Sequence, residues 1–369
     1  MTFPVVGSNI PSSYQISNSL RFNDGDNPRL TRTMATGTSR RIFTFSTWLK
    51  RSHLGTFQYV FANSPTSSFD AVRINSDDTL DIRFNDNVFT VRTNRVYRDV
   101  SSWYHILVAV DTTQSTASDR VKIYTNGSLE TSLAGTTYPT QNYDTSFGVS
   151  GQEYQVSTNT WNDDQAFDGY LAEVHFIDGQ ALSPTSFGEF DEDSGVWKPK
   201  QYAGTYGTNG FYLKFNNAGN MGEDSSGNDN TFTPTNLSGT TDVTTDTPTN
   251  NFATMNPLAV TSAGTATFSE GNCQVATVVV GSMGGYCNIN FPSSGKWYCE
   301  AKITTSSPSN AYIGVVEYSA TDSNSFTNGD STFYYGNGDK YVNGSTSSYG
   351  SAWSQNDINA LLSLVFAIP

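Results

Sequence analysis

A recurring period near two in short apolar segments is the feature that most constrains the fold of this chain. The segment 40–52, RRIFTFSTWLKRS, places apolar residues on both parities, which is typical of a central strand in a two-sheet stack. Similar short segments, separated by turn residues, recur at 58–62, 71–74, 79–85, 88–93, 101–113 and 120–132. Regularly spaced short strands of this kind predict an all-β, antiparallel sandwich or barrel.

The composition supports an all-β chain and narrows the class of partner. The chain has 369 residues, of which 36% are hydrophobic and 13% aromatic, enough for two or three domains with real cores. The net charge of −14 is uneven, because residues 1–130 have 14 Lys and Arg against 11 Asp and Glu, and the later residues have 6 against 23. Such an acidic second half argues against duplex DNA as a partner. The first half carries arginines spread along predicted strands, which favour solvated faces over an anion groove: Arg73, Arg83, Arg92, Arg95 and Arg98.

The cysteines and the hydropathy pattern point to a reducing compartment. Cys273, Cys287 and Cys299 are odd in number and widely spaced, so we expect buried thiols rather than a disulfide framework. The N-terminal sequence MTFPVVGSNIPSS lacks the basic region and apolar run of a signal peptide, and no apolar stretch is long enough to cross a membrane. We expect neither secretion by that route nor membrane insertion.

Five segments carry a resemblance to a known family. FTFSTWLKR, TLDIRF, WYHILVAVD, KIYTNGSLETS and FDGYLAEVHFIDGQALSP, in this order and spacing, resemble the laminin-G-like or pentraxin-like branch of the concanavalin A-type jelly rolls. The resemblance covers residues 19–236 and leaves 1–18 as an N-terminal arm. It implies an antiparallel jelly-roll sandwich. The resemblance places the family's usual opening strand at FYLKF, 211–215, so we expect a permuted chain in which FYLKF pairs with SLRF, 19–22.

A second β-sandwich is expected after a connector. Residues 237–249 are rich in Gly, Thr and Ser and predict a linker that neither packs nor stiffens. TATFSEGNCQVATVVV, FPSSGKWYCEAKITT and NAYIGVVEYSA then resemble the opening half of a SPRY-type sandwich, so 250–369 is expected to be SPRY-like and incomplete. The C-terminal apolar residues form an edge without an obvious mate and predict truncation or contact with another chain: Leu361, Leu362, Leu364, Val365, Phe366 and Ile368.

The sequence argues against an enzyme. Glucanases of this fold need two close carboxylates on one strand, and Glu189, Asp191 and Asp193 alternate correctly, but they follow a Ser-Pro turn and predict an acidic loop. His105 and His175 lie inside strand patterns, where packed or hydrogen-bonded histidines are favoured over general bases. The Cys and His residues never approach zinc-ligand spacing.

Ion and sugar binding are the open possibilities. Calcium needs clustered oxygens, and the candidate ligands stand in Asn- and Asp-rich runs that also suit ordinary Asx turns: Asp24, Asp26, Asp163 and Asp164. No other cofactor is expected. Sugar binding by such folds relies on rim loops and exposed aromatics, and the long loop expected at 135–166 offers candidates: Trp161, Asn162, Asp163, Asp164, Tyr143 and Tyr154. Glu173 and His175 are expected to face away from the main core.

The combination of the two resemblances suggests a setting. SLRFNDGDNPRLTRT, joined through DTPTNNF to a SPRY-like part, resembles structural proteins of tailed bacteriophages of marine bacteria. This implies a virion protein assembled in the bacterial cytoplasm, a tail fibre or head-surface appendage that attaches to host surface glycans and contacts other virion proteins, with homo-oligomers expected. The alternative is a decoration or adaptor subunit that binds no sugar. A polysaccharide depolymerase ranks third.

Overall fold

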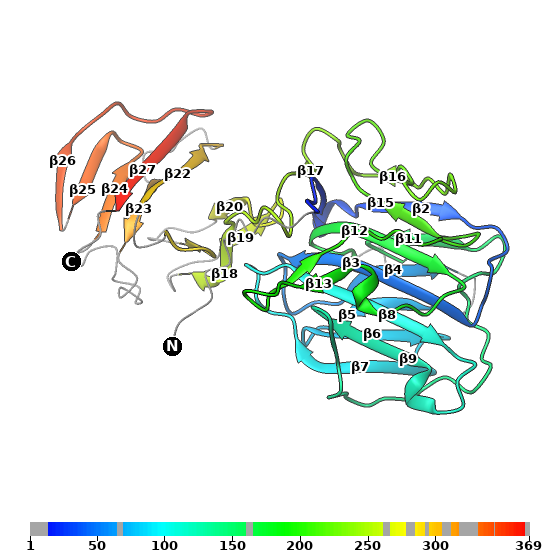
Figure 1. Cartoon of the computed structure of the whole chain (residues 1–369). Coiled ribbons are helices and arrows are strands. Elements are labelled where there is room, and N and C mark those ends of the chain that lie inside the picture. Colours follow the sequence, from blue (N-terminus) through cyan, green and yellow to red (C-terminus); the bar gives the residue numbers. More distant parts are fainter. Residues whose placement is uncertain are drawn as a thin grey trace. The chain divides into compact units, whose positions relative to one another are not determined.

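The computed structural model describes residues 14–64, 69–159, 165–260, 266–277, 285–291, 295–304, 311–316, 331–342 and 344–365 (Figure 1). By its internal contacts the chain divides into two units, Met1–Leu258 with Thr267–Ala276, and Ala259–Ala266 with Thr277–Pro369. Within the described residues, no helix has the length and apolar character needed to cross a membrane.

The first unit is an antiparallel sandwich of two large sheets. The eight-stranded sheet has the order β10-β9-β8-β3-β12-β1-β17, with β15 also paired to β12. Its strands are β1 (Ser19–Phe22), β3 (Ile42–Arg51), β8 (Tyr104–Asp111), β9 (Val121–Thr125), β10 (Ser128–Leu129), β12 (Gly169–Asp178), β15 (Phe211–Leu213) and β17 (Val243–Thr244).

The seven-stranded sheet packs against it with the order β16-β2-β11-β4-β5-β6-β7. Its strands are β2 (Arg29–Thr33), β4 (Gln58–Ser64), β5 (Ala71–Ile74), β6 (Thr79–Phe84), β7 (Phe89–Val96), β11 (Glu153–Val156) and β16 (Thr233–Thr235). The prediction of an all-β antiparallel sandwich is therefore confirmed, and β3 lies between β8 and β12 as a central strand.

Shorter elements complete the first unit. They comprise the 3-10 turns η1 (Asp24–Asp26), η2 (Ala117–Asp119) and η4 (Pro184–Ser186), and the hairpin of β13 (Gly188–Phe190) and β14 (Trp197–Pro199). The late strands are β18 (Met255–Val260), β19 (Ala266–Ser269) and β20 (Gln274–Thr277), each of which extends one or two residues beyond the first unit.

An aromatic core fills the space between the two sheets. Phe61 from β4 stacks on Phe45 from β3, with ring centroids 4.8 Å apart, and on Phe147 at 5.2 Å. Tyr154 packs edge-on against the Phe61 ring, and Phe176 packs against it at a tilt. Because successive strand residues point to opposite faces, the alternating aromatics of β3, β4 and β12 converge on one layer.

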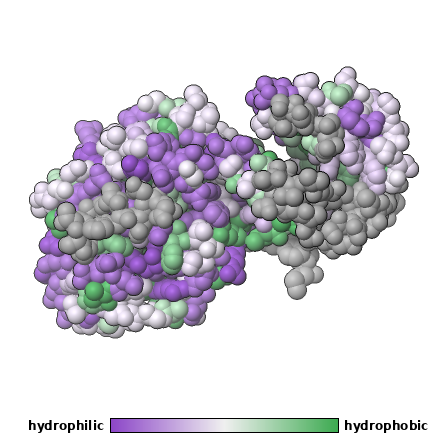
Figure 2. Space-filling model, turned by 180° about the vertical axis from the view of Figure 1, so that it is seen from behind, coloured by the Kyte–Doolittle hydropathy of each residue, from purple (hydrophilic) through white to green (hydrophobic). Residues whose placement is uncertain are grey.

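A third layer covers the outer face of the eight-stranded sheet. Trp48, Trp103 and Tyr170 on that face pack with Ile16 from the N-terminal segment and with Trp197 from the β13–β14 hairpin. On the opposite side of the molecule from the view of Figure 1, the surface of the first unit is mostly hydrophilic, with hydrophobic residues in small groups (Figure 2).

A β-bulge in β12 turns Glu173 toward this outer layer. The pairing of β12 with β3 shifts register between Ala172 and His175, and Glu173 has a positive φ of 51°. A bulge inserts one residue and re-aims its neighbours, so Val174 and Phe176 point into the core while His175 lies on the covered face. Glu173 and His175 face away from the main core as predicted, but both are buried.

Three local predictions are corrected. FYLKF does not pair with SLRF: β15 pairs with Val174–Phe176 of β12, and β1 pairs with Gly169–Leu171, so the two lie in succession along one edge of the same strand. The expected loop 135–166 contains a strand, β11, in the middle of the seven-stranded sheet. The expected linker 237–249 packs, because β17 pairs with β1 and the side chain of Asp246 is buried.

The second unit holds small antiparallel sheets. Its strands are β21 (Gly285–Cys287), β22 (Gly295–Lys302), β23 (Tyr312–Val316), β24 (Ser331–Tyr335), β25 (Asp339–Val342), β26 (Ser345–Ser348) and β27 (Ile358–Val365). The order β23-β24-β25-β26 forms one sheet, and β22 pairs with β27.

The C-terminal apolar segment finds a backbone mate within the chain, contrary to expectation. Leu361, Leu362, Leu364 and Val365 lie in β27 and pair with β22, whereas Phe366 and Ile368 lie outside the described residues. The SPRY-like resemblance and a partner contact here stay predictions. The prediction of buried thiols is wrong, because Cys273 and Cys287 are exposed and Cys299 is half-buried.

Candidate functional site

A polar groove of about 490 Å³ lies on the outer face of the seven-stranded sheet. Strands β5, β6 and β7 form its floor, and the segment 134–137, which bridges to β7, contributes one wall. Alternation explains the arrangement, because Leu80 and Ile82 of β6 point into the core and leave Asp81 and Arg83 on the outer face. The lining residues are Phe57, Arg73, Asn75, Ser76, Asp77, Asp81, Arg83, Asn87, Thr90, Arg92, Ala134, Gly135 and Thr137.

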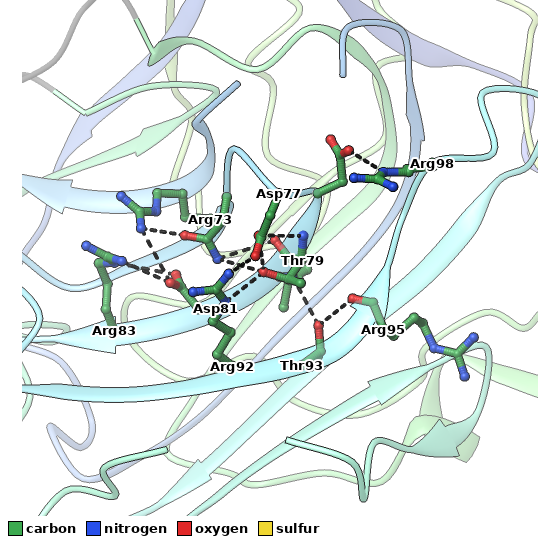
Figure 3. A network of polar contacts seen from close by, with 12 residues as sticks. Arg73, Asp77, Thr79, Asp81, Arg83, Arg92, Thr93, Arg95 and Arg98 are labelled. Atoms are coloured by element: carbon green, nitrogen blue, oxygen red, sulfur yellow. Dashed lines mark hydrogen bonds and ion pairs between the residues drawn. The ribbon is translucent and has the colours of Figure 1, made fainter. Parts of the chain in front are cut away.

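Two arginines of the groove converge on one buried carboxylate (Figure 3). Asp81 of β6 accepts two hydrogen bonds from Arg83, from Nη2 to Oδ2 at 2.9 Å and from Nε to Oδ1 at 3.4 Å. Arg73 Nη2 lies 3.5 Å from Asp81 Oδ2. Arg73 and Asp81 are direct cross-strand partners of β5 and β6. The carboxylate therefore fixes both guanidinium groups in place, since buried charge-assisted bonds of this kind are strong.

A third arginine occupies the next strand. Arg92 of β7 is the cross-strand partner of Asp81, and its Nε donates to Thr79 Oγ1 at 2.8 Å. Its Nη2 forms an ion pair with Asp77, whose carboxylate is half exposed. Asp77 also accepts a hydrogen bond from the Thr79 hydroxyl at 2.7 Å, and these contacts outweigh partial burial to lower the pKa of Asp77.

An aromatic ring borders the arginines. The guanidinium carbon of Arg73 lies 4.4 Å from the ring centroid of Phe57, a cation–π contact, and Phe57 is 38% exposed. Arg73 Nε is buried without a hydrogen-bond partner. Burial lowers the pKa of Arg73, although an arginine stays charged at any physiological pH. The groove thus combines a flat apolar plane with oriented donors.

The sequence-based interpretation of the arginines is corrected in part. Arg73, Arg83 and Arg92 line one groove, where solvated faces were expected. Arg95 and Arg98 do lie on exposed positions, where Arg95 pairs with Glu130 and Arg98 with Asp78.

A second cluster joins the predicted calcium ligand Asp24 to two residues that the sequence did not single out. Asp24 Oδ2 lies 2.7 Å from His53 Nδ1, and the Asp24 backbone N–H donates to Asp168 Oδ2 at 3.3 Å. Ligand atoms of the three side chains all lie within 4.8 Å of one another. Turn η1, the end of β3 and the start of β12 bring them together.

The charges of this cluster are coupled. Burial, with the neighbouring charge of Asp24, raises the pKa of Asp168 to about 7. The hydrogen bond with Asp24 raises the pKa of His53. Burial opposes ionisation of Asp24, but the hydrogen bond and charge of His53 outweigh it and lower the pKa of Asp24.

The described donors of this cluster do not fit calcium. Calcium prefers six to eight oxygen ligands, whereas two carboxylates and an imidazole nitrogen suit a transition metal better. Asp26 accepts a hydrogen bond from Asn23 at 2.7 Å and does not join the cluster. Asp163 and Asp164 lie outside the described residues, so a calcium site that includes them stays a prediction.

The predicted sugar-binding residues do not form a site within the described chain. Tyr154 is fully buried in the core and its hydroxyl accepts the Gly148 backbone N–H, so it offers no surface to a ligand. Tyr143 is half-buried and packs edge-on against Phe89. Trp161, Asn162, Asp163 and Asp164 lie outside the described residues.

The titratable residues on the outer face of the eight-stranded sheet are used internally. Glu173 accepts hydrogen bonds from the hydroxyls of Tyr212 at 2.6 Å and Tyr14 at 2.8 Å. Trp197 Nε1 donates to His105 Nδ1 at 3.1 Å, which leaves His105 Nε2 to donate to Ser46 at 2.9 Å. Burial lowers the pKa of His105 to about 3. Neither histidine of β8 or β12 faces an open cavity, as predicted for packed histidines.

The acidic segment 188–195 was expected to be a loop, but Glu189 lies in strand β13 and only the residues after Phe190 form a turn. Asp191 accepts hydrogen bonds from the backbone and hydroxyl of Ser194, which lower its pKa to about 2, and Glu189 and Asp191 both lie near Lys198, at 3.6 and 3.3 Å. Asp193 donates its backbone N–H to Asp191. Asp191, with its lowered pKa, is ionised near neutral pH and cannot serve there as a general acid.

Part of the first unit matches a known protein family. A laminin G family model, described as the Concanavalin A-like lectin/glucanases superfamily, matches residues 23–186. No curated protein matches the sequence.

Solved structures with detectable similarity include a heptameric SAP-like pentraxin of Limulus polyphemus, with 17% identity, a TM-score of 0.34 and coverage of 46% of this chain and 80% of that one. A candidate carbohydrate binding protein of Bacteroides ovatus has 14% identity and a TM-score of 0.40, and the match covers 63% of this chain and 60% of that one. Domain 4 of the arabinanase AbnA of Geobacillus stearothermophilus, in complex with arabinotriose, has 18% identity and a TM-score of 0.31, and the match covers 45% of this chain and 69% of that one. The first unit is a concanavalin A-like jelly-roll sandwich, and residues 23–186 carry the family match.

Proposed function

We propose that this protein is a non-enzymatic carbohydrate-binding protein and that the groove over β5, β6 and β7 holds the glycan. The observation that carries the proposal is the groove itself, in which Phe57 stands beside a fixed set of guanidinium, amide and hydroxyl groups. Sugar rings stack on flat apolar planes, and their hydroxyls need oriented polar partners. The volume of about 490 Å³ falls within the roughly 300–1,000 Å³ usual for ligand sites.

The absence of catalysis is part of the proposal. A glucanase of this fold needs two carboxylates, one nucleophilic and one acidic, beside an open cleft. On the eight-stranded sheet the space among Ser46, His105, Glu173 and His175 is filled. In the groove, Asp81 pairs with Arg73 and Arg83, and Asp77 pairs with Arg92, so both carboxylates are engaged by arginines.

The biological setting is proposed from the sequence. We infer a virion protein of a tailed bacteriophage, a fibre or surface appendage that attaches to host glycans and assembles with other virion proteins. The two resemblances in series and the acidic composition support this setting. A glycan-binding surface on such a protein would provide the first contact with the host.

A binding panel tests the proposal. The full chain is titrated against neutral and acidic polysaccharides, and reducing ends are assayed in the same samples. We expect binding to at least one glycan, no new reducing ends, and weaker binding for Phe57→Ala. Phe190→Ala, which removes an exposed ring on the β13–β14 hairpin, is the matched control and should bind normally.

Two results would overturn the proposal. Absence of binding across the panel would favour the decoration or adaptor role, in which the sandwich contacts only virion proteins. Release of reducing ends that Glu189→Gln abolishes would instead favour a depolymerase.

A further inference from the structure

We propose that the groove selects an anionic polysaccharide, whose carboxylate or sulfate groups bind beside Arg73, Arg83 and Arg92. This inference rests on the proposed glycan site and adds the chemical class of its ligand. Both acid groups are oxyanions that match the donors of a guanidinium group. Binding of a carboxylated polymer and of a sulfated polymer distinguishes the two acid groups.

The charge of the groove differs from that of the whole chain. Three arginines and two aspartates line it, so it is locally positive, whereas the chain carries a net charge of −14. The net charge of the chain therefore repels an acidic glycan, whereas the groove attracts it. Such a field selects one position on the surface, although it adds little affinity by itself.

The arginines are held ready for a ligand. Asp81 fixes Arg73 and Arg83 from one side, because Nη2 of each arginine donates to Asp81 Oδ2 and Arg83 Nε donates to Oδ1. The buried Arg73 Nε has no hydrogen-bond partner, and a buried unpaired donor costs free energy until an acceptor arrives. An oxyanion in the groove would meet guanidinium groups that Asp81 already holds in place.

The ion pair at the groove edge supplies the sharpest test. Asp77 is more than half exposed and neutralises Arg92, which is one-third exposed. If this network is purely structural, loss of either partner leaves ligand binding unchanged. If Arg92 attracts an anionic ligand, removal of the competing carboxylate strengthens binding and removal of the arginine weakens it.

The experiment uses the full chain and two substitutions of opposite sign. Binding of polygalacturonate, dextran sulfate and neutral dextran is measured by calorimetry. We expect Asp77→Asn to bind the acidic polymer about threefold more tightly, and Arg92→Gln about threefold more weakly, as for partly exposed charges. Arg73→Gln should lose about tenfold or more, because its charge is desolvated.

The controls separate this inference from the proposed function. Arg95→Gln removes the same charge from the same strand outside the groove and should have no effect. Binding of the acidic polymer should fall about tenfold between about 50 and 500 mM salt. Tightest binding of polygalacturonate identifies a carboxylate ligand, and tightest binding of dextran sulfate identifies a sulfate.

Three outcomes overturn the inference. Equal, salt-independent binding of neutral dextran leaves glycan binding intact and refutes the anionic class. An equal loss for Arg95→Gln and Arg92→Gln indicates general surface charge instead of the groove. Failure of every glycan to bind removes the proposed function together with this inference. Arg92→Gln changes an exposed pair, so the test survives if Arg73→Gln does not fold.

Discussion

Replacement of Lys50 by methionine should strongly destabilise the first unit. Lys50 is 1% exposed, and its Nζ donates to Asp246 Oδ2 at 2.9 Å, to Asn251 Oδ1 at 2.9 Å and to the Phe252 carbonyl at 2.8 Å. These bonds fasten segment 246–252 to β3. Lys50→Met keeps the length of the side chain but leaves the Asp246 carboxylate buried without its counter-charge.

The magnitude follows from the burial of the pair. Removal of one partner from a buried ion pair costs about 3–5 kcal/mol, and Trp103 Nε1, which donates to Asp246 Oδ1 at 3.1 Å, offsets only part of the lost charge. With a urea slope of about 3 kcal/mol/M, the unfolding midpoint should fall by about 1–1.7 M. Tryptophan fluorescence follows the transition, since Trp103 adjoins the site.

The design includes a control and a rescue. Arg41→Met breaks an exposed ion pair with Asp144 and should leave the midpoint nearly unchanged. The double variant Lys50→Met with Asp246→Asn should recover part of the loss, because it no longer buries an unpaired charge. A midpoint for Lys50→Met that matches that of Arg41→Met would refute the reasoning.

Three further predictions concern the core, the second cluster and the covered face. Phe61→Ala should cost about 3–5 kcal/mol in urea unfolding, because its ring contacts several core aromatics. The pKa values of Asp168 and His53 are raised, so the folded state holds both protons more tightly than the unfolded state does. The contribution of Asp168 to the free energy of unfolding is full below about pH 4, and that of His53 is full below about pH 6.5. Each contribution is lost as pH rises through the pKa of the folded state. Amide exchange at 23–27, corrected for intrinsic rates, should therefore be faster at pH 8 than at pH 6, and a His53→Gln variant with an unchanged pH response would contradict this. Glu173→Gln should leave glycan binding and reducing-end release as they are, and any loss of glycan binding would place a ligand on the covered face.

The architecture could be predicted because alternation is a local signal. The apolar residues on both parities of 42–51 required two covered faces, and β3 has them. The strand β11 escaped notice because Glu153–Val156 is only four residues long and lies within a Gly-, Ser- and Asn-rich stretch. Its inward Tyr154 then looked like an exposed rim aromatic.

The candidate sites were harder to predict because they depend on strand pairing. Arg73 and Asp81 meet only through the register of β5 with β6, and Arg92 joins them through β7. The available signal was that Arg73, Asp81 and Arg83 alternate with apolar residues of their strands. Asp24 and Asp168 are separated by more than a hundred residues, and no local pattern predicts that β1 and β12 pair beside them.

A crystal structure of the chain with a short oligogalacturonate would test the central claim most directly. The account predicts sugar density in the groove over β5, β6 and β7, with a ring against Phe57 and a carboxylate within hydrogen-bond distance of Arg73 or Arg92. Sugar density at Asp24, His53 and Asp168 instead, with an empty arginine groove, would contradict it.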